Sequence, residues 1–176
     1  AGFDSSNVDL DAIAPVLSIT TGDGANDTIT LDDKSGANSN GVSYVVTNST
    51  VARAASGGIF SMTYDAGTER LNLLVDDAAN VPGYTTTVAV ESTNAGTRTT
   101  IVGGGRNEIF NLTNLGSLAG PLALEGGSLG GDVDAVRLQD GANTTGRDFT
   151  LLPGSIAFTG GGLSPVSFSG LESVGI

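Results

Sequence analysis

Residues 135–152 read AVRLQDGANTTGRDFTLL, which is an apolar run, a turn of the form A-N-x-x-G, and a second alternating run. The same turn occurs at residues 37–41 and 79–83, and in all three copies an aspartate stands three to five residues before the asparagine. Alternation of apolar and polar residues is typical of strands with one buried face. Each copy therefore predicts a strand, a turn and a second strand.

The spacing of these turns suggests a repeat. Gly41 and Gly83 are 42 residues apart, and Gly83 and Gly146 are 63 residues apart. The common divisor, about 21 residues, suits one coil of a parallel β-solenoid. The spacing predicts an all-β chain: a right-handed parallel β-solenoid, or β-helix, of about eight coils over residues 17–176.

A second family of turns supports this interpretation. Residues 22–27, 103–108 and 126–132 are rich in glycine, carry an acidic residue at or near the end, and lead into an apolar run. Glycine adopts the positive φ angles of tight corners, and asparagine and aspartate tolerate them. We expect these segments to form the corners of the repeat.

Residues 1–16 lie outside the repeats. Ser6 and Asp9 resemble a capping box, and Pro15 would end a helix that begins there. Residues 8–12 also alternate as a strand would. The segment could thus be a helix or a strand, and in either case we predict an N-terminal cap or assembly arm.

Composition excludes several classes of function. The chain has no cysteine and no histidine, which removes disulfides, ordinary zinc sites and catalysis by His or Cys. A net charge of -12 argues against nucleic acid as a partner, and no apolar run is long enough for membrane insertion. The chain opens with Ala1 instead of Met, which indicates a processed polypeptide or an excised fragment, and we favour secretion to the extracellular cell surface as the explanation.

Two segments, residues 138–151 and 168–174, resemble repeats of large secreted bacterial surface proteins. They match the pattern L-x-D-x-A-x-T-T-G-R-x-x-T-L followed by a G-[IVL]-E-x-[LV] segment, and the likeness is good over residues 126–176 and partial over 69–112. The resemblance implies parallel β-helix arrays with structural or adhesive roles. Residues 22–29 are more weakly similar to the Gly-rich calcium-binding nonapeptide turns of secreted toxins and proteases.

Acidic residues supply the candidate sites. Four aspartates fall within eleven residues and are candidate oxygen ligands for calcium, with turn formation and surface charge as the alternative: Asp23, Asp27, Asp32 and Asp33. Paired carboxylates could also cleave glycosides, and Asp132 with Asp134 or Asp32 with Asp33 would be such pairs. A sugar cleft usually has aromatic platforms, however, and the chain has six Phe, three Tyr and no Trp. No catalytic residues are therefore assigned.

Taken together, these patterns predict a non-enzymatic extracellular structural protein. Its subunits would join head to tail, by end-to-end stacking or strand addition, into a surface filament or matrix. The alternative is a calcium-stabilised adhesin or binding module cut from a larger surface protein. No cofactor is required in either case, and calcium is the one candidate ion.

Overall fold

The computed structural model describes residues 16–34, 41–55, 58–75, 84–127, 132–141, 148–159 and 162–176. Residues 1–15, which make up nearly all of the predicted cap or arm, lie outside the described residues. The A-N-x-x-G turns also lie outside them, except for Gly41.

The described residues form fifteen strands in two sheets. The eight-stranded sheet contains β1 (Val16–Ile19), β3 (Ser43–Val46), β4 (Thr50–Ala55), β5 (Gly58–Tyr64), β7 (Thr85–Val90), β9 (Asn107–Leu112), β11 (Ala135–Leu138) and β15 (Ser173–Gly175). The seven-stranded sheet contains β2 (Thr28–Asp32), β6 (Arg70–Leu74), β8 (Arg98–Val102), β10 (Leu122–Glu125), β12 (Asp148–Leu152), β13 (Ser155–Thr159) and β14 (Val166–Ser169). One short 3-10 helix, Leu115–Ser117, is the single helical element of the described chain.

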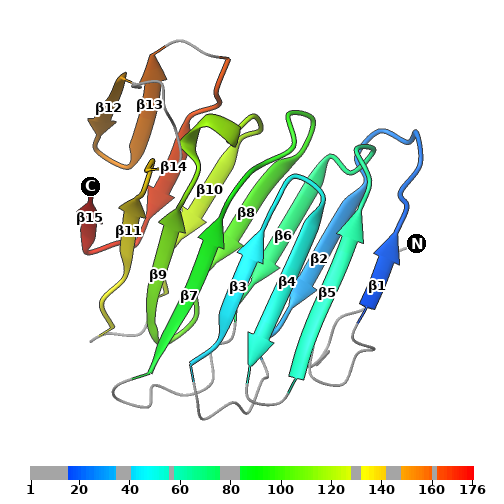
Figure 1. Cartoon of the computed structure of the whole chain (residues 1–176), viewed down its shortest axis with the longest axis horizontal. Helices are drawn as coiled ribbons and strands as arrows, with labels where there is room; N and C mark the ends of the chain where they lie inside the picture. Colours follow the sequence, from blue (N-terminus) through cyan, green and yellow to red (C-terminus); the bar gives the residue numbers. More distant parts are fainter. Residues whose placement is uncertain are drawn as a thin grey trace.

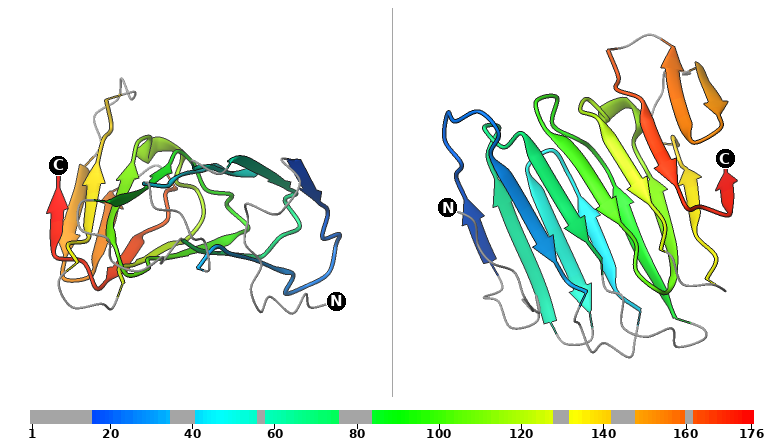
Figure 2. Two further views of the ribbon diagram at one scale, coloured as in Figure 1. Left: turned by 90° about the horizontal axis from the view of Figure 1, so that it is seen from below. Right: turned by 180° about the vertical axis from the view of Figure 1, so that it is seen from behind.

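The chain passes back and forth between the two sheets in its central part. From β6 to β11 each strand lies in the opposite sheet from the one before it. Strands of the same sheet therefore pair in parallel, as β7 does with β9 and β6 with β8. Figure 1 shows the strands side by side across the molecule, and Figure 2 shows the two sheets facing each other.

The expected all-β content is present, but the prediction of a right-handed β-solenoid of about eight coils is wrong. Both sheets are mixed, because β4 runs antiparallel to β3 and β5, and β13 runs antiparallel to β12 and β14. β4 and β5 thus pair as a hairpin that stays within one sheet.

The hairpins explain why the spacing misled the prediction. Val88 on β7 pairs with Phe110 on β9, which is 22 residues later, whereas Tyr44 on β3 pairs with Val88, which is 44 residues later. The longer interval contains the β4–β5 hairpin. An interval that resembles two equal coils is therefore one passage between the sheets plus a hairpin.

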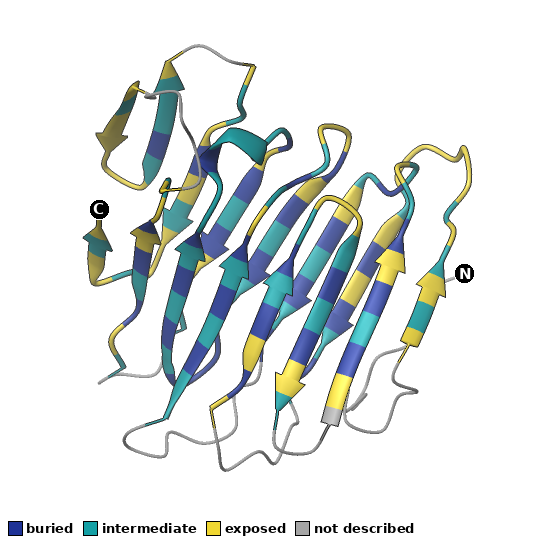
Figure 3. Cartoon of the chain, viewed as in Figure 1, coloured by how far each residue is buried: buried dark blue, intermediate teal, exposed yellow. Residues whose placement is uncertain are grey.

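The core lies between the sheets and follows from strict alternation. Strands β7 and β9 each bury every second residue (Figure 3). Val88, Phe110 and Val136 form one such row across three neighbouring strands, and all three are fully buried. Burying an aliphatic or aromatic side chain of this kind stabilises the fold by about 1.5–3 kcal/mol.

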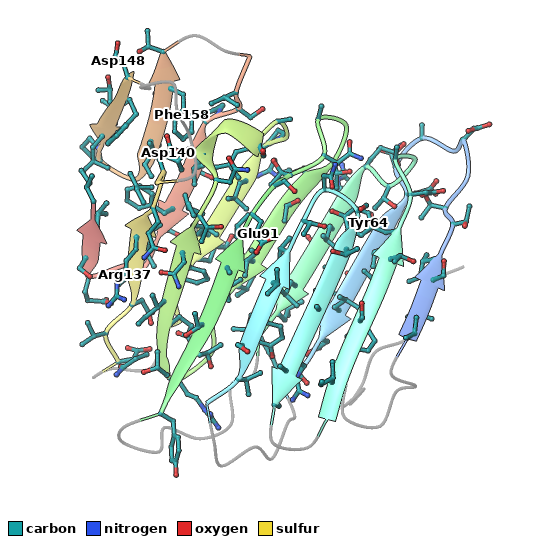
Figure 4. All side chains as sticks on the ribbon, in the orientation of Figure 1. Tyr64, Glu91, Arg137, Asp140, Asp148 and Phe158 are labelled. Atoms are coloured by element: carbon teal, nitrogen blue, oxygen red, sulfur yellow. The ribbon has the colours of Figure 1, made fainter. Side chains whose placement is uncertain are left out.

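Tyr64, at the end of β5 (Figure 4), gives this core a pH dependence. Its hydroxyl donates a hydrogen bond to the carbonyl oxygen of Thr47 at 2.7 Å, and burial raises the pKa of Tyr64 to about 12. An unfolded tyrosine ionises near pH 10, so the folded state alone keeps its proton between about pH 10 and pH 12. Stability from Tyr64 is therefore complete below pH 10 and is lost as the pH rises towards 12.

We expect the free energy of unfolding to fall with pH in this range more steeply for the wild type than for Tyr64→Phe. The two slopes should differ by about 1.4 kcal/mol per pH unit. Urea unfolding at pH 8, 10 and 11 measures it. Equal slopes for the two proteins would show that Tyr64 ionises as freely in the folded state as in the unfolded chain.

Candidate functional site

The connections that lead from the seven-stranded sheet to the eight-stranded sheet lie one above another. Backbone hydrogen bonds join them past the strand ends: Asp33 N–H to Leu74 O at 3.0 Å, Val75 N–H to Val102 O at 3.0 Å, Gly103 N–H to Glu125 O at 2.7 Å, and Gly126 N–H to Ser169 O at 2.8 Å. We call Asp33, Val75, Gly103 and Gly126 the corner stack. It continues the ladder of the seven-stranded sheet around the turn.

Three carboxylates gather beside the corner stack, and we call them the acidic cluster: Glu108, Asp132 and Asp134. One carboxylate oxygen from each lies within 4.8 Å of those from the other two. Glu108 and Asp134 are buried, with 0% and 1% of their surface exposed, and Asp132 is half-buried. Three acidic groups are thus held together largely out of water.

Sheet register produces this arrangement. Ala135 on β11 pairs with Ile109 on β9, so the residues one position earlier, Asp134 and Glu108, are neighbours across the two strands. The Glu108 N–H donates to Asp134 Oδ1 at 2.8 Å, as this register requires. Ser173 pairs with Ala135 on the other side, so Glu172 continues the same row, and its Oε2 accepts the Asp134 N–H at 2.6 Å.

The hydrogen bonds within the cluster are distributed unequally. Asp134 accepts two backbone hydrogen bonds. The Gly127 N–H donates to its Oδ2 at 2.8 Å, and the Glu108 N–H donates to its Oδ1. Within the described part of the chain, neither side-chain oxygen of Glu108 has a hydrogen-bond partner, and neither does Asp132 Oδ2. Thr86 Oγ1, next to Glu108 in the row, is also buried without one.

These surroundings shift the acidity of two of the three groups. Burial raises the pKa of Glu108 to about 9, and the adjoining Asp134 carboxylate adds to the increase. Burial and the charge of Asp134 also raise the pKa of Asp132. A shift in this direction means that the buried charge is under-compensated.

Glycines make room for the cluster. A Cβ atom on Gly126 would stand 2.5 Å from Asp134 Oδ2, and one on Gly103 would stand 3.0 Å from Glu108 Oε2. A Cβ on Gly127 would stand 3.0 Å from Asp132 Oδ2 and only 1.7 Å from the carbonyl oxygen of Gly104. The Gly-rich composition of residues 103–108 and 126–132 therefore lets backbone and carboxylates approach each other closely.

The four aspartates predicted as calcium ligands are not brought together. Asp23 and Asp27 precede β2, whereas Asp32 and Asp33 stand at its other end, and a five-residue strand is about 17 Å long. Asp23 is exposed, and the Asp27 N–H donates to Glu69 Oε2 at 2.6 Å. Asp32 Oδ1 accepts the Lys34 N–H at 3.1 Å, which is a local turn contact.

Asp33 has a structural environment of its own. It is fully buried, and its Oδ2 accepts hydrogen bonds from Arg53 Nε on β4 and from the Tyr44 hydroxyl on β3. Arg53 is also buried. These contacts tie the first corner to the β4–β5 hairpin, and they remove Asp33 from the surface where a glycosidic bond could reach it.

Glu108 was not singled out as a ligand from the sequence, although Asp132 and Asp134 were considered as a catalytic pair. The feature of the sequence that points to Glu108 is the similarity between the turns at 103–108 and 126–132. Two similar turns on successive passages between the sheets place their acidic ends on adjacent strands.

The chain matches no protein-family model, no curated protein and no solved structure. Within the described residues no helix is long and apolar enough to cross a membrane. A shallow groove of about 380 Å³ is lined by Arg98, Pro121, Leu122, Ala123, Ser155, Pro165 and Ser167, so no carboxylate faces it. The acidic cluster is therefore the candidate functional site.

Proposed function

We propose that this chain is a non-enzymatic structural protein of the extracellular surface, whose subunits join head to tail by parallel strand addition. The observation that carries the proposal is that the two edge strands of the eight-stranded sheet run in the same direction and leave apolar side chains exposed. The resemblance of residues 138–151 and 168–174 to repeats of secreted bacterial surface proteins supports the extracellular setting.

The direction of the edge strands follows from the pairings. β3, β7, β9, β11 and β15 are parallel throughout. β4 reverses direction, β5 restores it, and β1 pairs with β5 in parallel. The outer side of β15 in one copy can therefore meet the outer side of β1 in the next copy, with both strands pointing the same way.

Neither edge strand contains a charged residue or a proline, two of the devices that commonly protect sheet edges. Natural edges are commonly guarded by charged residues, by proline or by bulges. β1 reads VLSI and β15 reads SVG, without a charge or a proline in either. A contact between such unlike ends is heterologous, which gives an open filament when the rotation between copies does not close a ring.

Exposed apolar side chains gather at the same two ends. Among the described residues, five of the six large hydrophobic side chains that are exposed lie on or beside the outer strands: Val16, Ile59, Leu151, Leu152 and Ile176. Leu151 and Leu152 belong to the β12–β13 hairpin, which projects past β14 in Figure 1. Exposed large apolar side chains that are concentrated at the ends of the sheets favour these ends as contact sites.

Lysine at either end tests the proposal. Val16 is 70% exposed and Ile176 is 84% exposed, so Val16→Lys and Ile176→Lys should fold normally. We expect each to raise the protein concentration needed for assembly at least about tenfold, because lysine opposes strand addition. Sedimentation velocity over a concentration series, with electron microscopy of the products, measures this change.

Ser43→Lys is the matched control, because Ser43 is exposed on β3 in the interior of the same sheet. It should assemble as the wild type does. The proposal fails if the wild type stays monomeric at every concentration, or if the end variants assemble as readily as Ser43→Lys.

A calcium-stabilised adhesin or binding module is the second candidate, and the acidic cluster favours it. If the protein is such a module, we expect a monomer whose stability rises with calcium, since an ion bound only to the folded state stabilises that state by mass action. The same sedimentation series, run with calcium and with chelator, separates the two candidates.

A further inference from the structure

The acidic cluster requires a positive partner that the described side chains do not provide. Glu108, in β9, and Asp134, immediately before β11, are neighbours across the two strands, and like charges directly opposite one another destabilise a sheet. A buried carboxylate is tolerated when a cation, a proton or several donors neutralise it. Two N–H groups serve Asp134, but neither side-chain oxygen of Glu108 makes a well-formed hydrogen bond within the described chain. The nearby Gly104 backbone and Asp134 carboxyl influence the pKa of Glu108 without compensating its burial.

Among the described residues, no basic side chain donates a hydrogen bond to Glu108. Arg106 is two residues before Glu108 and is buried, but its guanidinium carbon lies 6.0 Å from the centre of the Tyr84 ring. Neither oxygen of Glu108 accepts a hydrogen bond from it. The close approach of Gly103, Gly126 and Gly127 to the cluster leaves little room beside it for a lysine or arginine head group.

We propose that Glu108, Asp132 and Asp134 bind one Ca²⁺ ion. Three carboxylate oxygens within 4.8 Å of each other offer the hard oxygen ligands that this ion prefers. The orphaned oxygens of the fully buried Glu108 and the buried Oδ2 of Asp132 are the independent sign of a missing ligand. The inference does not depend on head-to-tail assembly.

The surroundings favour calcium over magnesium. Magnesium keeps several water molecules and requires near-octahedral geometry, whereas calcium accepts six to eight oxygens in irregular cages that include backbone carbonyls. Glu108 and Asp134 are almost completely shielded from water. The Gly104 carbonyl oxygen and Asp132 Oδ2 both approach Gly127 closely, which places a backbone oxygen beside the cluster.

Such an ion would join two successive passages of the chain. Glu108 is at the start of β9, and Asp132 and Asp134 immediately precede β11. The corner residues Gly103 and Gly126 each contact one of these carboxylates. Calcium would thus hold the eight-stranded sheet and the corner stack together near the β15 edge of that sheet.

Calorimetric titration of the full chain with CaCl₂, after removal of ions by chelator, tests the site. The protein is kept at a concentration where sedimentation shows a single species, so that assembly does not contribute. We expect one site per chain and a rise in melting temperature with calcium. Glu108→Gln and Asp132→Asn should each weaken binding at least about tenfold, because affinity depends on the number of charged ligands.

Asp23→Asn is the matched control, because it removes one charge from an exposed aspartate outside the cluster. It should bind calcium as the wild type does. MgCl₂ and KCl at equal ionic strength should give little stabilisation. Circular dichroism checks that each variant is folded. If Glu108→Gln does not fold, Asp132→Asn alone tests the site, because Asp132 is only half-buried.

Three results would overturn the proposal. The first is a wild type that does not respond to calcium up to about 5 mM, which exceeds the range of weak extracellular sites. The second is an equal response to MgCl₂ or KCl, which indicates screening of the net charge. The third is unaltered binding in both cluster variants, which would place the ion elsewhere.

Discussion

Replacing Arg53 by methionine is expected to lower the free energy of unfolding by about 3–5 kcal/mol. Arg53 and Asp33 are both buried, and the Arg53 guanidinium donates directly to the Asp33 carboxylate. Methionine fills much of the volume but removes the buried cation that pairs with Asp33, while the Tyr44 hydroxyl still donates to this carboxylate. The cost therefore comes from an uncompensated carboxylate and not from a cavity.

Chemical denaturation of three proteins measures this effect. Arg70→Met is the control, because Arg70 is exposed on β6, and its change should stay within about 0.5 kcal/mol. The double variant Asp33→Asn with Arg53→Met should recover part of the loss, since it removes both charges. An Arg53→Met protein within about 1 kcal/mol of the wild type would contradict the dependence of the hairpin on this pair.

Replacing Gly120 by alanine is expected to cost about 3 kcal/mol or more, through forced separation of packed backbone. A Cβ on Gly120 would stand 1.8 Å from the Asn94 carbonyl oxygen and 2.7 Å from that of Thr97. Both neighbours are backbone atoms of the preceding connection, and the Gly120 N–H and carbonyl oxygen are held by Thr93 Oγ1 at 2.9 Å. Neither side of the contact can rotate away.

Gly141→Ala provides the comparison. No atom lies within 4 Å of the position that its Cβ would take. We expect no loss, or a small gain from reduced freedom of the unfolded chain. Thermal unfolding of the two variants measures the difference, and equal melting temperatures would show that the connections yield more easily than their packing indicates.

Local structure was predictable because strand periodicity is local. The strand predicted before each of the three A-N-x-x-G turns is present, as β2, β6 and β11, and each of these strands buries every second residue. The regular repeat failed because nothing in the alternation reveals whether a strand crosses to the other sheet or turns back beside its neighbour. Pro153 and Gly154, with φ of 77° at the glycine, form the tight turn that makes the β12–β13 reversal.

The acidic cluster depends on register, which is not a local property. Glu108 and Asp134 are 26 residues apart and become neighbours only because β9 and β11 pair with Ile109 opposite Ala135. A slip of two residues would separate them while preserving the alternation that predicts both strands. The four aspartates close together in sequence were the more visible group, yet β2 holds them apart.

The strand order also determines how this protein would respond to mechanical load. Val16 begins one edge strand of the eight-stranded sheet, and Ile176 follows the opposite edge strand. Tension between these two residues acts across the strands, roughly along the ladder hydrogen bonds, instead of shearing them all at once. The sheet would then lengthen by peeling one strand at a time, so it would dissipate work gradually and not rupture in a single event.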